Sequence, residues 1–140
     1  MASFFLERTV NIPIDRLWSL VGDFTKSPCP GISVTSEKQG DPRAGGVGTI
    51  RTITIGHVRV REIIETVNPP HGFSYRILSG APVKEYVGRA LFEDKDGRTF
   101  IRWSGDFKPK ILFTGGICCK VAKGAVVQLL DSIEKHHSKP

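Results

Sequence analysis

The sequence has little cysteine and no residue spacing typical of a metal site. Its three cysteines are Cys29, Cys118 and Cys119. A disulfide between the two adjacent cysteines would strain the backbone, and three thiols do not make a disulfide framework. We therefore expect free thiols in a reducing cytoplasm. No Cys-x-x-Cys or Cys/His pattern is present, so neither a metal nor another cofactor is predicted.

Long apolar runs are also absent. No stretch approaches the roughly 18 consecutive apolar residues that a membrane-spanning helix needs. Residues 1–8 lack the basic segment and the apolar core of a signal peptide. The sequence therefore predicts neither a signal peptide nor integral membrane association, and it favours a cytoplasmic location.

Motifs for nucleophilic catalysis and for phosphate or calcium binding are missing as well. There is no Gly-x-Ser-x-Gly elbow, and the four histidines fall in turns or at the tail, where none makes a triad. Gly45, Gly46 and Gly48 precede a strand, whereas a phosphate loop precedes a helix. Residues 94–97 form a turn without the later ligands of a calcium loop. No catalytic residue is assigned.

Negative charge is in the minority, and the net charge is +6. Such a balance could indicate a nucleic acid or an anionic membrane surface as partner. The arginines are nevertheless spread singly along strands, where they alternate with apolar residues as on a solvated sheet face. No recognition helix or aromatic RNA-binding pattern accompanies the charge, so we do not expect a nucleic acid partner.

What the sequence does contain is one domain, residues 1–140, with alternating strand patterns between two helical patterns. Pro13 is expected in the first turn of the first helix, capped by Asn11 or Ile12. The order predicts an α+β fold in which a curved antiparallel sheet wraps a long C-terminal helix and encloses an apolar cavity. The expected strands are 3–12, 32–38, 47–55, 58–67, 73–78, 84–93 and 98–108, and the expected helices are 13–22 and 113–135.

Alternation along the strands predicts which side chains face the helix. The inner sets are expected to be Phe73, Tyr75 and Ile77; Tyr86, Gly88, Ala90 and Phe92; and Thr99, Ile101, Trp103, Gly105 and Phe107. The small inner residues Gly88, Ala90 and Gly105 would either leave a void or permit sheet curvature. On the last helix, Ile117, Val121, Ala125 and Gln128 form one stripe beside Cys118, Ala122, Val126, Leu129 and Ile133.

Two charged residues are expected on the inner face as well. Of the two possible faces of strand 58–67, we favour the one with Val60, Glu62, Ile64 and Thr66, because the other is more charged. On the preceding strand we favour Arg51 and Ile53 as inner residues. Arg51 and Glu62 could then pair across adjacent strands, since a buried charge needs a partner. The pair would be either a polar anchor for a ligand or an ion pair at the rim.

These residues resemble a known group of proteins, the START-like, helix-grip (Bet v 1-like) superfamily, and within it the bacterial polyketide cyclase/dehydrase and lipid transport group. The resemblance covers nearly the whole chain. It rests on Pro13, Leu17-Trp18, Asp23-Phe24, Gly46 to Arg51, Glu62, Phe73-Ser74-Tyr75 and Thr99 to Phe107. It implies seven strands gripping the C-terminal helix, one or two short helices after the first strand, and an elongated cavity between sheet and helix.

Together, the pattern and the resemblance lead to three functional hypotheses. The first is a non-catalytic binding or carrier protein for a small hydrophobic molecule such as a lipid, a polyketide or another polycyclic compound. The second is a polyketide cyclase or aromatase, with Glu62 or Tyr86 as the acid or base. The third is a protein-interaction module with a solidly packed core. A monomer or a weak homodimer is expected. The candidate ligand-binding residues are Arg51, Ile53, Glu62, Tyr75, Tyr86, Thr99, Trp103, Phe107, Val121 and Ala125.

Overall fold

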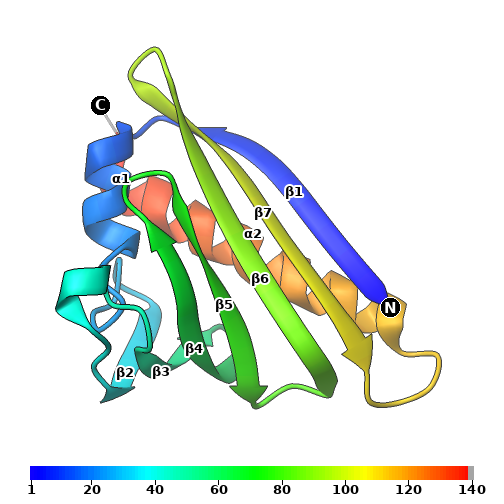
Figure 1. Cartoon of the computed structure of the whole chain (residues 1–140). Coiled ribbons are helices and arrows are strands. Elements are labelled where there is room, and N and C mark those ends of the chain that lie inside the picture. The colour runs from blue at the N-terminus through cyan, green and yellow to red at the C-terminus, as the bar shows by residue number, and fades with distance from the viewer. Residues whose placement is uncertain (139–140) are drawn as a thin grey trace.

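Seven antiparallel strands form one curved sheet in the order β1-β7-β6-β5-β4-β3-β2 (Figure 1). The computed structural model of the protein describes residues 1–138. From β2 to β7, strands adjacent in sequence are also neighbours in the sheet, and β1 pairs with β7. The strands are β1 (Ala2–Val10), β2 (Ile32–Lys38), β3 (Ile50–Ile55), β4 (Val58–Asn68), β5 (Gly72–Ser79), β6 (Val83–Lys95) and β7 (Arg98–Pro109).

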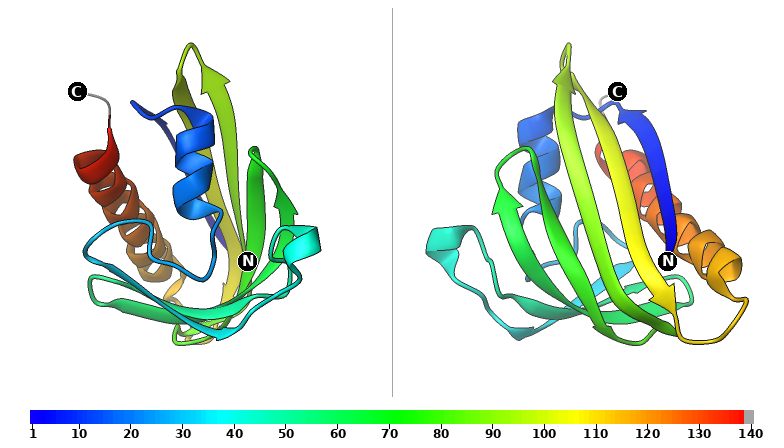
Figure 2. Two further views of the ribbon diagram at one scale, coloured as in Figure 1. Left: turned by 90° about the vertical axis from the view of Figure 1, so that its left-hand side faces the viewer. Right: turned by 45° about the vertical axis from the view of Figure 1, so that its right-hand side comes forward.

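Two α-helices and one 3-10 turn complete the elements of residues 1–138: α1 (Ile14–Val21), η1 (Pro42–Ala44) and α2 (Gly115–His137). The sheet curves round α2, as Figure 2 shows, and α2 contacts β1, β7 and β3. This is the predicted helix-grip arrangement. Its physical basis is burial of one stripe of α2 against the inner face of the sheet, through Val126, Leu129, Leu130 and Ile133.

The short helix α1 fills the space between α2 and one end of the sheet. Trp18, predicted as a core anchor, makes edge-to-face contacts with Phe24, Phe73 and Phe92 at centroid distances of 6.2–6.5 Å. The predicted cap is wrong, however. Pro13 itself is the N-cap residue, with extended backbone angles and no side-chain cap, so the helix begins one residue later than expected.

Alternation correctly predicted the inner faces of β5, β6 and β7, whose inner residues are buried with the sole exception of the half-buried Ile77. It failed at the end of β4. A β-bulge shifts the register between Ile64 and Thr66, so Thr66 is exposed instead of buried. An extra residue reverses the alternation beyond it. The hydroxyl of Thr66 instead meets that of Ser74 on the outer face.

The two inner glycines of β6 and β7 leave no void, because tyrosine rings lie over them. A Cβ atom on Gly88 would stand 2.2 Å from Cζ of Tyr75, and one on Gly105 would stand 2.7 Å from the hydroxyl of Tyr86. Gly124 in α2 differs, because a Cβ there would meet nothing within 4 Å. It therefore makes no room for a strand or a ligand.

The outer face of the sheet carries most of the arginines on strands, as expected, whereas Arg51 is buried on the inner face. Four of the outer arginines pair with acids. Three of these pairs join adjacent strands: Arg76 with Glu65, Arg89 with Asp106 and Arg102 with Glu7. The fourth joins Arg61 on β4 to Glu37 on β2, across β3. These side chains are largely exposed, so each pair contributes little to stability. Each of these four arginines therefore has its positive charge locally compensated by an acid.

Candidate ligand-binding cavity

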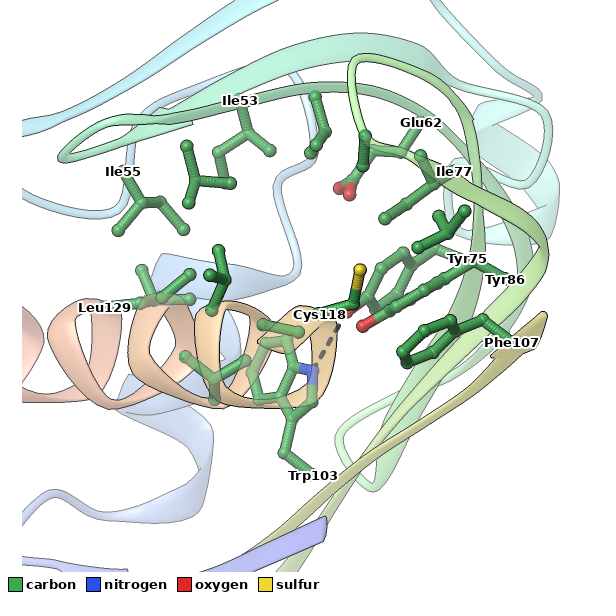
Figure 3. A pocket seen from close by; sticks show the side chains of 18 of the residues that line it. Ile53, Ile55, Glu62, Tyr75, Ile77, Tyr86, Trp103, Phe107, Cys118 and Leu129 are labelled. Atoms are coloured by element: carbon green, nitrogen blue, oxygen red, sulfur yellow. Dashed lines mark hydrogen bonds between the residues drawn. The ribbon is translucent and has the colours of Figure 1, made fainter. Parts of the chain in front are cut away.

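A cavity of about 210 Å³ lies between the inner face of the sheet and the first half of α2 (Figure 3). Its walls are almost entirely apolar. Ile117 and Val121 line it although they are 66% and 51% exposed, so the cavity meets solvent near the start of α2. The lining residues are Arg51, Ile53, Ile55, Val58, Val60, Glu62, Phe73, Tyr75, Ile77, Ala81, Pro82, Val83, Tyr86, Trp103, Phe107, Ile117, Cys118, Val121, Ala122, Ala125, Val126 and Leu129.

Arg51 and Glu62 provide the cavity's only two charges among the residues that the structure describes. They are register partners on β3 and β4, and both are buried. Nε and Nη2 of Arg51 lie 2.9 and 2.8 Å from the same carboxylate oxygen, Oε1 of Glu62. Nη1 of Arg51 donates to the carbonyl oxygen of Phe24 at 3.3 Å, and its guanidinium stands 5.5 Å from the centre of the Phe24 ring. The pair is therefore buried, and the interpretation as a rim ion pair is wrong.

Two tyrosines and Trp103 supply further polar side-chain atoms of the sheet wall. The hydroxyl of Tyr75 accepts a hydrogen bond from Nε1 of Trp103 at 3.1 Å, drawn as a dashed line in Figure 3. Burial, and then the nearby Glu62 carboxylate, raise the pKa of Tyr75 to about 12. Burial also raises the pKa of Tyr86, with a further contribution from Tyr75. Both phenols are therefore neutral near pH 7 and can donate hydrogen bonds, but they are poor bases.

Nine of the ten candidate residues line the cavity. The exception is Thr99, expected in the wall. It is fully buried on β7, and its hydroxyl donates to the carbonyl oxygen of Ile12 at 2.7 Å. Thr99 therefore stabilises the connection between β1 and α1 and does not line the cavity. Alternation correctly predicted that Thr99 faces inward. It could not predict that Thr99 lies at the part of β7 that α1 covers.

The sequence reasoning missed the part of the wall that comes from a turn. Ala81 and Pro82, between β5 and β6, and Val83, the first residue of β6, line the cavity. The sequence indicated only that this segment ends a strand. Phe24 was also missed as the residue that holds Arg51. No pattern in the sequence pairs a loop carbonyl with a distant guanidinium.

Other kinds of site find no support in the part of the chain that the structure describes. Within residues 1–138, no three His, Cys, Asp or Glu side chains gather as a metal site would require. None of the helices described is long and apolar enough to cross a membrane. The cavity also departs from the solid core expected of a pure interaction module.

A curved antiparallel sheet that grips a C-terminal helix round an apolar cavity defines the helix-grip class of proteins. The sequence matches the family model for polyketide cyclase/dehydrase and lipid transport proteins over residues 1–138. The chain therefore belongs to this family. Family and fold are consistent with either hydrophobic ligand binding or cyclase-type chemistry. Among curated proteins, none matches the sequence significantly.

Solved structures share the fold at low sequence identity. A START superfamily protein from Mycobacterium smegmatis has a TM-score of 0.76 at 13% identity, with 97% of each chain covered. Ara h 8.0201 has a TM-score of 0.72 at 23% identity, covering 96% of this chain and 95% of that one. Norcoclaurine synthase from Thalictrum has a TM-score of 0.69 at 18% identity, covering 95% and 91%. At such identities the likeness extends to the fold alone.

Proposed function

We propose that this protein binds and carries a small, neutral, largely apolar molecule in the cavity between the sheet and α2. The observation that carries the proposal is an apolar cavity in which the two buried charges cancel each other. Apolar walls with a few convergent polar groups are typical of small-molecule sites. We expect the protein to act in the cytoplasm as a monomer or a weak homodimer.

We infer that the ligand is neutral because the guanidinium of Arg51 already has its partners within the protein. Three of its nitrogen atoms already face Glu62 or the Phe24 carbonyl. An anionic ligand would meet the Glu62 carboxylate without a free counter-charge, and desolvating that anion would be unfavourable. A hydroxyl or carbonyl group suits the site better, because the carboxylate accepts hydrogen bonds and the neutral phenols of Tyr75 and Tyr86 donate them. Figure 3 shows the Glu62 carboxylate turned toward the centre of the cavity.

The size of the ligand follows from the volume of the cavity. At about 210 Å³ it exceeds the roughly 150 Å³ of an engineered cavity that binds benzene. It is smaller than the roughly 300 Å³ at which drug-sized pockets begin. The geometry therefore supports a one- or two-ring compound or a single short chain better than a large polycyclic one.

Binding can be tested first by native mass spectrometry of protein purified without detergent, compared with denaturing mass spectrometry. We expect an apolar adduct that is lost on denaturation. A complementary titration uses 2-naphthol and naphthalene-2-carboxylate, two ring systems of the same size that differ in charge near neutral pH. We expect 2-naphthol to quench the fluorescence of Trp103, and the quenching to disappear in W103F. Equal or tighter binding of the carboxylate would contradict a neutral ligand, and no binding of either probe, together with a clean apo mass, would contradict the proposal.

The enzyme hypothesis has one specific observation in its favour. A carboxylate, on Glu62, and the phenols of Tyr75 and Tyr86 all line the same cavity. Such a set can remove a proton from a poly-β-keto substrate while donating hydrogen bonds to its carbonyl oxygens. Cyclisation of a poly-β-keto thioester mimic by the protein, lost in E62Q while 2-naphthol binding is retained, would favour the enzyme. An unchanged rate in E62Q would remove Glu62 from that role.

A further inference from the structure

Three consecutive large apolar side chains stand in solvent on the loop that joins β7 to α2. Ile111, Leu112 and Phe113 are 58%, 77% and 92% exposed. Ile117 and Val121, in the first two turns of α2, continue the exposed apolar surface. The N-terminus, where Met1 is also exposed, lies beside the start of α2 (Figure 1), and the thiol of Cys119 meets the carbonyl oxygen of Ser3 there. We call Ile111, Leu112 and Phe113 the apolar tip.

The local backbone fixes the apolar tip in this exposed position. Both the amide and the hydroxyl of Thr114 donate to the carbonyl oxygen of Ile111, and the amide of Cys118 donates to the carbonyl of Thr114. Phe113 has a φ of 67°, in the left-handed region that bulky residues rarely adopt. A phenylalanine that takes up this conformation without gaining any burial indicates a side chain presented to a partner.

The surroundings of the apolar tip are basic. Four lysines occupy residues 108–123, with no acidic residue between them: Lys108, Lys110, Lys120 and Lys123. All four are exposed, and Lys108 pairs with Glu85. The first turn of α2 has no acid either, so the positive end of the helix dipole adds to the potential. Apart from Lys108, no lysine of this group forms an ion pair within residues 1–138, so the charge of Lys110, Lys120 and Lys123 is not compensated in the way that the four paired arginines of the outer sheet face are.

The apolar tip also lies next to the opening of the cavity. The amide of Lys110 donates to the carbonyl oxygen of Pro82 at 3.0 Å, which joins the loop to the turn that forms one side of the wall. Ile117 and Val121 belong both to the exposed surface and to the cavity lining. A partner that covers the apolar tip would therefore cover the opening.

We propose that the apolar tip and its lysines dock on the surface of an anionic lipid bilayer. Exposed Leu and Phe side chains surrounded by lysines match the boundary between acyl chains and negatively charged headgroups. A second copy of this chain would bring the same uncompensated lysines together, which is unfavourable. Docking through the apolar tip and its lysines does not require a ligand in the cavity. The inference therefore goes beyond the proposed function and does not depend on it.

The test is co-sedimentation with phosphatidylcholine vesicles, with and without phosphatidylglycerol. We expect binding only to the anionic vesicles, and weaker binding as salt is raised. The double variant L112S/F113S should weaken binding by more than about tenfold, because serine cannot replace the apolar area that Leu112 and Phe113 would bury in the bilayer. The double variant K120Q/K123Q should weaken it by about fivefold per lysine.

Matched controls lie elsewhere on the molecule. Phe5 is 60% exposed on β1 outside the apolar tip, so F5S removes an exposed phenylalanine without touching the proposed surface. Lys26 and Lys135 lie toward the other end of α2, where His137 contacts the carbonyl oxygen of Pro28, so K26Q/K135Q removes the same charge. Both controls should bind anionic vesicles like the wild type.

Three outcomes would overturn the docking proposal. The first is no binding to anionic vesicles, and the second is equal loss in the controls. The third is a dimer in light scattering that disappears in L112S/F113S while vesicles are not bound, which would assign the surface to a second copy. Titration of L112S/F113S with 2-naphthol separates this result from the proposed function, because cavity binding should persist whichever way the vesicle experiment turns out.

Discussion

Arg51 and Glu62 face each other directly across β3 and β4 and form a buried ion pair in the wall of an otherwise apolar cavity, with Nη2 and Oε1 2.8 Å apart. Neither charge has an alternative partner of opposite sign in the cavity lining. The two residues therefore stabilise each other, and the pair sets which ligands the cavity can accept.

Removing one member of this pair is expected to destabilise the fold more than removing both. E62Q should lower the free energy of unfolding by about 3–5 kcal/mol, because it leaves Arg51 charged and buried. The apolar double variant R51M/E62L should recover most of that loss. Urea unfolding measures both, and E37Q, which breaks the exposed pair with Arg61, serves as the control with little change. A double variant as unstable as the sum of its single variants would contradict this account.

A second prediction concerns ionisation of the only two tyrosines in the chain, Tyr75 and Tyr86. An unfolded tyrosine ionises near pH 10, whereas burial holds the pKa of Tyr75 at about 12 in the folded protein. Between these values the unfolded state binds fewer protons, so stability is fully present below pH 10 and falls as pH rises toward 12. For Tyr75 alone the loss reaches about 2–3 kcal/mol.

Tyrosinate absorbance near neutral to alkaline pH measures this directly. The measurement is made at about pH 10–11, which reaches about one unit above the usual pKa of tyrosine. We expect the folded protein to show no tyrosinate signal at this pH, and the signal of two tyrosines to appear only on unfolding. In Y75F the signal after unfolding should halve. A tyrosinate signal in protein that circular dichroism shows to be folded at pH 10 would mean that the phenols are accessible to water.

The inner faces of the strands could be predicted from the sequence because side chains alternate strictly along a regular strand. That rule placed Trp103, Phe107 and Tyr86 inside, and it favoured Glu62 and Arg51 over their neighbours. It failed at Thr66, where the bulge in β4 adds a residue. Bulges depend on how two strands pair, and a single strand's sequence carries no mark of that pairing.

Position along a strand was harder to predict than its face. Thr99 lies on the correct face but under α1, because the cavity occupies only the end of β7 nearer to α2's start. Of the two alternatives for Gly88 and Gly105, a void or sheet curvature, the void is wrong, because Tyr75 and Tyr86 fill the space over these glycines. Both outcomes depend on side chains from distant segments, which share no local pattern with the residues they cover.

The glycines beneath the tyrosine rings give a third prediction. G88A should destabilise the protein by about 1–3 kcal/mol, because the new methyl group displaces the Tyr75 ring. G124A adds the same methyl group in open space on α2 and should stabilise the protein by about 0.5–1 kcal/mol. The melting temperatures of the two variants should therefore move in opposite directions. A G88A variant as stable as the wild type would show that Tyr75 does not lie against Gly88.

The last prediction places the ligand between the sheet and α2 rather than elsewhere. Ala125 is half-buried and lines the cavity, so A125F should fill much of the 210 Å³ without forcing the helix away. Val127, two residues on, is outside the lining and 37% exposed, and V127F adds a phenyl group there instead. We expect A125F to weaken 2-naphthol binding by at least about tenfold, since a filled cavity excludes the ring, and V127F to leave it unchanged. Fluorescence titration measures both, and urea unfolding checks that both variants fold. If A125F is folded and binds 2-naphthol as tightly as the wild type, the probe occupies a different site. That result would also contradict the proposed role of Arg51 and Glu62 in selecting neutral ligands.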